Sequence, residues 1–124
     1  FLVRDENNTT ISILGINVDL KNRENYEQVA HIASHGQIRA INPVNQSVDG
    51  DTVFVFSTEE IKDFLSPLGK TIADNAWPKL AIDIIGQAAA KAVQESIYDA
   101  CYKAETIKFE DAYRGVIPSA KDYK

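Results

Sequence analysis

The chain of 124 residues has the size of a single domain, and its hydrophobic (44%) and charged (25%) fractions are those of a globular protein. Its formal net charge of -5 argues against non-specific binding to nucleic acid, which requires clustered Lys and Arg. No apolar run approaches the roughly 20 residues needed to cross a bilayer, and residues 1–8 lack the basic and apolar regions of a signal peptide. We therefore expect one soluble, cytoplasmic domain without nucleic-acid or membrane partners.

The first half of the chain predicts a strand, a helix and a second strand. Residues 11–18 place apolar side chains on both faces, as in a buried strand. Asn22 offers a helix cap, and apolar residues then recur at three- and four-residue spacing over residues 23–38, which indicates an amphipathic helix. Residues 51–57 follow an Asp-Gly turn and are rich in β-branched and aromatic residues, which is typical of a strand. Because a helix between two strands usually returns the chain to the same sheet, we expect parallel neighbouring strands.

The second half predicts one long helix. Asn75 can cap this helix, Pro78 is tolerated in its first turn, and the helical pattern continues to about Ala104. Cys101, the only cysteine, cannot form an internal disulfide, and we interpret it as a small buried hydrophobe. The last twenty residues have no clear period. One stripe of the helix consists largely of small side chains that allow close contact with a neighbouring surface: Ala81, Ile85, Ala88, Ala89, Ala92, Val93, Ile97, Ala100 and Cys101.

The predicted element order is β-α-β-α, an α/β arrangement with only two strands. Two strands do not form a stable sheet alone in water. We therefore expect the chain either to pair with itself or to belong to a larger protein whose other strands precede Phe1.

Two polar clusters lie at the starts of the predicted strands. The first contains Asn8-Thr9 and leads directly into the first strand, and the second is Asp49-Gly50-Asp51, with two carboxylates two residues apart. Taken alone, each cluster is an ordinary strand entrance or turn. If the strands are parallel neighbours, both clusters lie at one end of the sheet. At least one carboxylate would then reach the Thr9 side chain directly or through one water.

With the residues between them, these clusters resemble the family that contains L-aminopeptidase/D-esterase, β-peptidyl aminopeptidases and 6-aminohexanoate-oligomer (nylon) hydrolase. The resemblance implies a layered αββα fold of the N-terminal-nucleophile type. This chain would supply a β-α-β-α piece that is incomplete without an upstream large chain. The resemblance rests on four ordered motifs: Asn8-Thr9-Thr10-Ile11, Arg39-Ala40-Ile41 with Pro43-Val44, Asp49-Gly50-Asp51-Thr52-Val53-Phe54, and an Ala-rich helix followed by a short tail.

The resemblance also implies a precursor that cuts itself before a Ser or Thr, here at Asn8-Thr9. Residues 1–8 would end the upstream segment, and residues 9–124 would form the catalytic small chain. Thr9 would be the nucleophile, and Asp49 and Asp51 match the acidic pair that assists it in the nylon-hydrolase branch. The family's Lys and Asn contributors come from the large chain. The implied partners are therefore that large chain and further subunits of a homo-oligomer.

The chemistry of these residue types agrees with the resemblance. A threonine hydroxyl is a poor nucleophile until a base takes its proton, and a free N-terminal amine with a pKa of about 7.7–8.0 is partly neutral near pH 7. Cutting before Thr9 would create that base, and before the cut Asp49 or Asp51 is the candidate activating group. We therefore expect a hydrolase that acts on amide bonds of peptides or peptide-like oligomers, without metal or organic cofactor.

Two other functions fit the same architecture. One is an acyltransferase of the ornithine-acetyltransferase type, in which an amine replaces water in the second step. The other is a non-catalytic binding or assembly module that keeps the fold without the chemistry. An uncut Asn8-Thr9 junction in the sequence agrees with this last alternative.

The two histidines, His31 and His35, lie four residues apart on one face of the predicted helix. Such a pair can bind a metal, but a zinc-protease motif requires a Glu directly after the first His, and the chain contains no third His. We therefore expect surface or packing roles for both.

Overall fold

The computed structural model describes residues 9–44, 50–66, 72–111 and 115–122. Strands β1 and β2 pair in parallel, with Ile11 opposite Thr52 and Ile16 opposite Ser57. This pairing and the β-α-β-α order of the first four elements confirm the predicted α/β class and the predicted parallel neighbours. The elements are β1 (Ile11–Val18), α1 (Arg23–Ala40), β2 (Thr52–Ile61), α2 (Ile72–Lys103), β3 (Ile107–Lys108), β4 (Val116–Ile117) and the 3-10 helix η1 (Ala120–Asp122).

Helix α1 begins where the sequence predicts. Asn22 is extended (φ -143°, ψ 162°), and its side chain accepts a hydrogen bond of 2.9 Å from the backbone N–H of Asn25. This bond satisfies one of the N–H groups that the first turn of a helix leaves without a partner. The helix continues to Ala40, two residues beyond the predicted end, and the N–H of Ile41 still bonds the Gln37 carbonyl at 2.9 Å.

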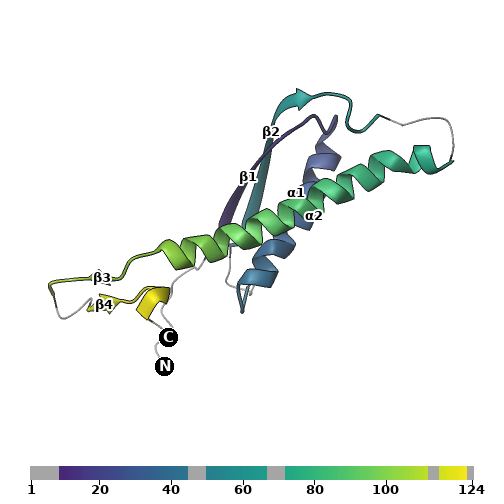
Figure 1. Cartoon of the computed structure of the whole chain (residues 1–124). Helices are drawn as coiled ribbons and strands as arrows, with labels where there is room; N and C mark the ends of the chain where they lie inside the picture. Colours follow the sequence, from purple (N-terminus) through teal and green to yellow (C-terminus); the bar gives the residue numbers. More distant parts are fainter. Residues whose placement is uncertain (1–8, 45–49, 67–71, 112–114, 123–124) are drawn as a thin grey trace.

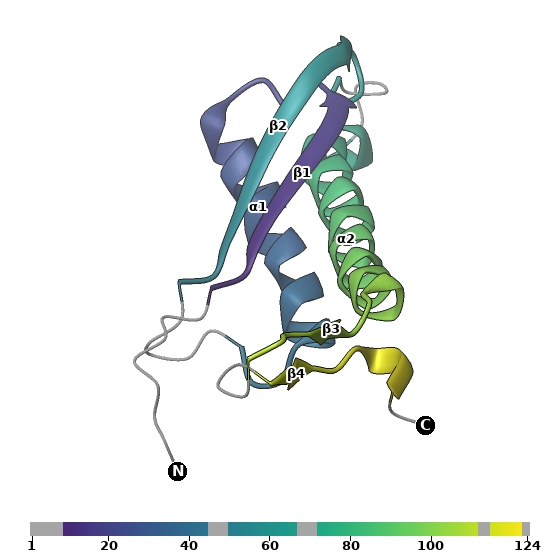
Figure 2. The same ribbon diagram turned by 90° about the vertical axis from the view of Figure 1, so that its left-hand side faces the viewer.

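Both long helices lie side by side on one face of the β1–β2 sheet (Figures 1 and 2). Alternate residues of the strands, including Leu14, Ile16, Val53 and Val55, pack against the core between the sheet and the helices. The period-2 alternation of a strand therefore directs one apolar set inward. The fully or nearly fully buried core residues are Val18, Leu20, Val29, Ala33, Leu65, Ala81, Ile82, Ala89 and Val93.

Helices α1 and α2 approach each other closely at two glycines. A Cβ atom at Gly36 would lie 2.3 Å from the carbonyl oxygen of Ala90, and one at Gly86 would lie 2.6 Å from Cδ1 of Ile32. Real Cβ atoms do not occupy such positions, so glycine is required at both for this packing. The predicted close contact of α2 with a neighbour is thus made, and it is made to α1.

The side of α2 that makes this contact differs in part from the predicted stripe. Ala81, Ala89 and Val93 are buried as expected, whereas Ala88, Ala92 and Ala100 are exposed. The prediction that Cys101 is buried is wrong, because this residue is exposed. The reason is length: α2 has 32 residues against 18 in α1, and its C-terminal turns run past the end of α1 (Figure 1).

Two further boundaries and the tail differ from the sequence prediction. Helix α2 begins at Ile72, so the predicted start at Asn75 is wrong, and Pro78 lies inside the helix, beyond its first turn. Strand β2 continues to Ile61, four residues beyond its predicted end. In the tail, the short strands β3 and β4 form an antiparallel pair that the sequence pattern did not indicate.

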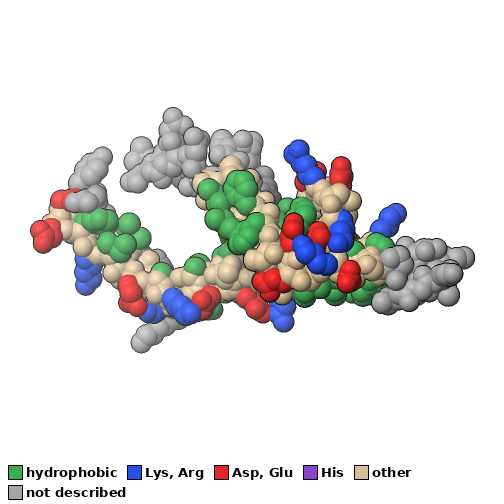
Figure 3. All heavy atoms as spheres, turned by 90° about the horizontal axis from the view of Figure 1, so that it is seen from above, with side chains coloured by type: hydrophobic (Ala, Val, Ile, Leu, Met, Phe, Trp, Pro, Cys, Tyr) green, Lys and Arg blue, Asp and Glu red, His purple; other side chains and the backbone are tan. Residues whose placement is uncertain are grey.

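The face of the sheet opposite the helices carries large apolar side chains at the surface. Ile11, Ile13, Phe54 and Phe56 are 60%, 72%, 58% and 54% exposed, respectively. Figure 3 shows hydrophobic side chains gathered in patches among charged ones on the surface that it views. Contiguous apolar surface of this kind marks an interaction site more often than a free surface.

Within the described residues, no helix is both long and apolar enough to span a membrane.

Candidate active site

The starts of β1 and β2 bring the two polar clusters of the sequence together. Parallel strands begin at the same edge of a sheet, and the register that places Ile11 opposite Thr52 places Thr9 beside Gly50. The exposed Thr9 hydroxyl donates a hydrogen bond of 2.5 Å to the Gly50 carbonyl oxygen. A Cβ atom at Gly50 would lie 3.2 Å from Oγ1 of Thr9, so the missing side chain of Gly50 leaves room for the hydroxyl.

Thr10, the residue after Thr9, is fixed through both of its backbone polar groups. Its N–H donates a hydrogen bond of 2.8 Å to Oδ1 of the half-buried Asp51. Its carbonyl oxygen accepts a hydrogen bond of 2.9 Å from the N–H of Thr52. The Asp51 carboxylate therefore bonds the residue next to Thr9, and a carboxylate acceptor makes this contact with Thr10 a strong one.

A side chain of α1 completes the hydrogen-bond network at this edge. Gln37 is 1% exposed, and its Nε2 group donates toward the hydroxyl of Ser12 at 2.9 Å and the carbonyl oxygens of Thr52 and Thr10 at 3.2 and 3.3 Å. The last turn of α1 is thus tied to the first residues of both strands. A buried amide that donates to several acceptors fixes the relative position of the elements that carry them.

The structure describes only part of the predicted site. Thr9 and Asp51 are brought to one edge of the sheet, whereas Asn8 and Asp49 lie outside the described residues. His31 and His35 stack edge to face, with ring centroids 5.6 Å apart. No cluster of three or more potential metal ligands occurs in the described ranges.

The family relationship follows from the sequence as a whole. The family model of Peptidase family S58 matches residues 3–114, which is most of the chain and includes Thr9 and Asp51. The chain belongs to peptidase family S58. This match confirms the resemblance to the L-aminopeptidase family that the motifs indicated. No curated protein and no solved structure matches the chain significantly.

Membership of peptidase family S58 assigns the general activity, which is hydrolysis of peptide bonds. The site at the starts of β1 and β2 carries the residue types for a hydrolysis that uses a hydroxyl nucleophile.

A carboxylate with a lowered pKa, Asp19, lies at the other end of β1 from this site. The pKa of Asp19, after the far end of β1, is lowered by the backbone N–H of Lys21 and then by the Lys21 ammonium, both of which donate hydrogen bonds to it.

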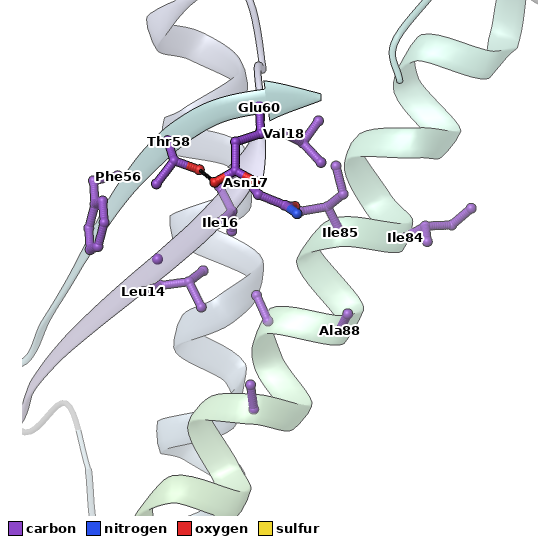
Figure 4. Close-up of a pocket in the computed structure, with 13 residues that line it drawn as sticks. Leu14, Ile16, Asn17, Val18, Phe56, Thr58, Glu60, Ile84, Ile85 and Ala88 are labelled. Atoms are coloured by element: carbon purple, nitrogen blue, oxygen red, sulfur yellow. Dashed lines mark hydrogen bonds between the residues drawn. The ribbon is translucent and has the colours of Figure 1, made fainter. Parts of the chain in front are cut away.

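A largely apolar groove runs along the edge of β1 that faces α2 (Figure 4). One section has a volume of about 660 Å³ and is lined by residues that include Leu14, Ile16, Ile85 and Ala88. A second section, of about 410 Å³, continues toward the start of β1 and includes Thr10 in its lining. Among the described residues β1 pairs with β2 alone, so this edge of the sheet borders the groove and ends at the candidate site.

Gln37 is the site residue that the sequence reasoning missed. A signal for it exists, because Gln37 lies four residues after Ala33 and therefore continues the apolar stripe of α1 with a polar side chain. Buried polar side chains in such a stripe require hydrogen-bond partners, which Gln37 finds at the sheet edge. The identity of those partners could not be derived from the pattern, since it depends on the packing of α1 against the strands.

Proposed function

We propose that this chain is the nucleophile-bearing part of a self-processing N-terminal threonine hydrolase. Thr9 becomes the nucleophile when the Asn8–Thr9 bond is cut, and the enzyme hydrolyses amide bonds in peptides or peptide-like oligomers. The observation that carries the proposal is the position of Thr9 beside Gly50, with the Asp51 carboxylate bonded to the N–H of the next residue, Thr10, in a chain of peptidase family S58.

The proposed self-cleavage uses the Thr9 hydroxyl. A base takes its proton, Oγ1 attacks the carbonyl carbon of Asn8, and the Asn8–Thr9 C–N bond breaks as the Thr9 nitrogen takes up a proton. Water then hydrolyses the resulting ester between Asn8 and the Thr9 side chain, which leaves a free Thr9 amine. Among the described residues, Asp51 is the carboxylate that bonds the residue next to Thr9, and it is therefore a candidate for this base. Asp49 remains a candidate from the sequence.

In the mature enzyme the neutral Thr9 amine acts as the base. It accepts the proton of its own hydroxyl, Oγ1 attacks the substrate carbonyl, and the departing amine of the substrate takes that proton. Water then hydrolyses the acyl ester. A positioned base of this kind typically contributes about 10²- to 10⁴-fold in rate, and hydrogen bonds that stabilise the oxyanion contribute further.

The proposal includes a partner, the large chain of the same precursor. Its support is the surface that this chain leaves uncovered: the apolar outer face with Ile13, Phe54 and Phe56, and the groove that borders β1. A two-stranded sheet gains stability from further strands or a second layer, and an upstream segment can supply both. Association into a homo-oligomer remains part of the same proposal.

Substitution of the nucleophile tests the assignment. In the full-length precursor, Thr9→Ala is expected to abolish both the appearance of a chain that begins at residue 9 and the hydrolysis of peptide substrates. Thr9→Ser keeps a hydroxyl and is expected to retain both activities. Mass spectrometry of the purified protein over time measures the cut. Normal cleavage in the Thr9→Ala protein would reject the assignment.

Thr10→Ala is the matched control, because Thr10 is also a threonine and directly follows Thr9. Thr10 enters the network through its backbone N–H and carbonyl, both of which alanine retains. Self-cleavage is therefore expected to continue at a rate close to that of the unchanged protein. Loss of cleavage in the Thr10→Ala protein together with persistence in the Thr9→Ala protein would assign the nucleophile to residue 10.

A further inference from the structure

A buried side chain outside the predicted nucleophile and acidic pair donates a hydrogen bond to the residue that follows Thr9. Gln37 lies in the last turn of α1 and is 1% exposed. Its Nε2 group lies 3.3 Å from the Thr10 carbonyl oxygen, 3.2 Å from the Thr52 carbonyl oxygen and 2.9 Å from the Ser12 hydroxyl. Since an amide has two N–H groups for these three acceptors, at least one N–H is shared.

These bonds complete a clamp on Thr10. On one side of this residue, Asp51 accepts from the N–H, and on the other side Gln37 and the Thr52 N–H donate to the carbonyl. Both peptide groups of Thr10 are thereby held, and the planar group that it shares with Thr9 also fixes the position of the Thr9 Cα atom. The clamp joins three elements, because Gln37 comes from α1, Thr10 precedes β1 and Asp51 precedes β2.

Such a clamp has a specific use at the start of a chain. Fixing the backbone of one residue costs roughly 1–2 kcal/mol of conformational entropy, and a residue that has lost its preceding peptide bond is restrained from one side only. Thr9 itself makes a side-chain hydrogen bond to the Gly50 carbonyl, which the hydroxyl must give up or share when it attacks. Among the contacts of the described residues, the one that remains to restrain Thr9 during the reaction is its link to Thr10.

We propose that Gln37 is a positioning residue that holds the Thr9–Thr10 segment in reactive geometry through the Thr10 carbonyl. This inference rests on the proposed role of Thr9 as nucleophile. Gln37 does not touch the reacting atoms. It acts on the rate of the chemical step, because the attack requires Oγ1 to be placed within a fraction of an ångström of its productive position.

Gln37→Met in the full-length precursor is the primary test. Methionine has a similar length and volume but no N–H donor, so the helix keeps its packing while the bonds to Thr10, Ser12 and Thr52 are lost. Self-cleavage is expected to slow by about 10- to 100-fold, measured as the appearance of the chain that begins at residue 9. For the matured fraction, kcat per Thr9 amino terminus on an alanine p-nitroanilide is expected to fall similarly, with KM changed less than about threefold.

Val29→Ala is the control for a purely structural effect. Val29 is a fully buried core residue of the same helix that takes no part in the network, so its truncation destabilises the fold without releasing Thr10. At a temperature well below both melting transitions, Val29→Ala is expected to leave the self-cleavage rate and kcat within about twofold of the unchanged protein. A loss in Val29→Ala as large as that in Gln37→Met would assign Gln37 to stability and overturn the proposal.

Gln37→Asn extends the test, because it keeps the amide but shortens its reach by one methylene. It is expected to be slower than the unchanged protein in both reactions. Normal rates in a folded Gln37→Met or Gln37→Asn protein would overturn the proposal, as would failure of both to fold under conditions in which Val29→Ala folds. Thr9→Ala distinguishes failure of the proposed function from failure of the positioning role. Activity in Thr9→Ala rejects Thr9 as the nucleophile. An inactive Thr9→Ala protein together with normal rates in the Gln37 variants rejects the positioning role alone.

Discussion

Replacing Gly50 by alanine is expected to impair the reaction without weakening the fold. The added Cβ would lie 3.2 Å from Oγ1 and 3.7 Å from Cβ of Thr9, and within the described part of the chain these are its close contacts beyond its chain neighbours. The first distance is tighter than an ordinary van der Waals contact, so the Thr9 side chain must move by a few tenths of an ångström. Among the described residues, the perturbation therefore acts mainly on Thr9, the proposed nucleophile.

The size of the effect follows from this displacement. A misplacement of about 1 Å in a reacting group can reduce the rate about 100-fold, so a few tenths of an ångström is expected to reduce kcat and the self-cleavage rate by about 3- to 10-fold. This corresponds to about 0.7–1.4 kcal/mol in the activation free energy. The free energy of unfolding should change little, since Gly50 does not have a positive φ and alanine restricts the unfolded chain by about 0.4–1 kcal/mol in favour of folding.

Rates of self-cleavage by mass spectrometry, kcat by p-nitroanilide release and melting temperature together provide the assay. Gly115→Ala is the control for the reverse case, in which stability changes and the rates do not. Gly115 has a φ of 64°, and a Cβ atom there would meet nothing within 4 Å in the described part of the chain. It should lower the free energy of unfolding by about 1–2 kcal/mol and leave both rates unchanged. Unchanged rates in Gly50→Ala, or a rate loss that only parallels a lower melting temperature, would refute the reasoning.

Three further predictions concern the scaffold. Gly36→Ala would place a Cβ atom 2.3 Å from the Ala90 carbonyl oxygen and is expected to lower the free energy of unfolding by about 3 kcal/mol, measured by denaturant titration; a loss below 1 kcal/mol would contradict the close helix contact. Asn22→Ala removes the cap bond to the Asn25 N–H and should cost about 1 kcal/mol in the same measurement, whereas Asn22→Asp should cost little. Ile13→Asp, at a position 72% exposed in this chain, should prevent co-purification of the large chain; intact association would show that the outer sheet face is not covered.

Much of the local structure was predictable because it depends on local pattern. Strand β1 occupies the predicted range, α1 begins after the predicted cap at Asn22, and the two strands pair in parallel as the β-α-β order required. The proposed roles of Thr9 as nucleophile and of Asp51 as its acidic partner came from the resemblance, since both are ordinary residues at strand starts. The structure adds that these two residues lie at one edge of the sheet.

The features that escaped prediction depend on non-local packing. Which side of α2 is buried is decided by the fit of Gly36 and Gly86 between the helices, so a stripe of small residues alone pointed partly to the wrong side. Cys101 is exposed because α2 extends past the end of α1, and the position of one helix along another is not set by the local sequence pattern. Gln37 carried a readable signal, but its partners lie 15 to 27 residues away in the chain.

The position of the site at the beginnings of the strands has a consequence for how specificity evolves. In open α/β sheets with parallel strands, ligands usually bind beyond the carboxyl ends, and the connections that follow the strands diversify. Here the proposed nucleophile, Thr9, stands just before β1, at the opposite end of the strand. Substrate preference among relatives should therefore vary with the connection that enters β2, between Ile41 and Asp51, while the turn that leaves β1 at Asp19 remains free to serve the fold.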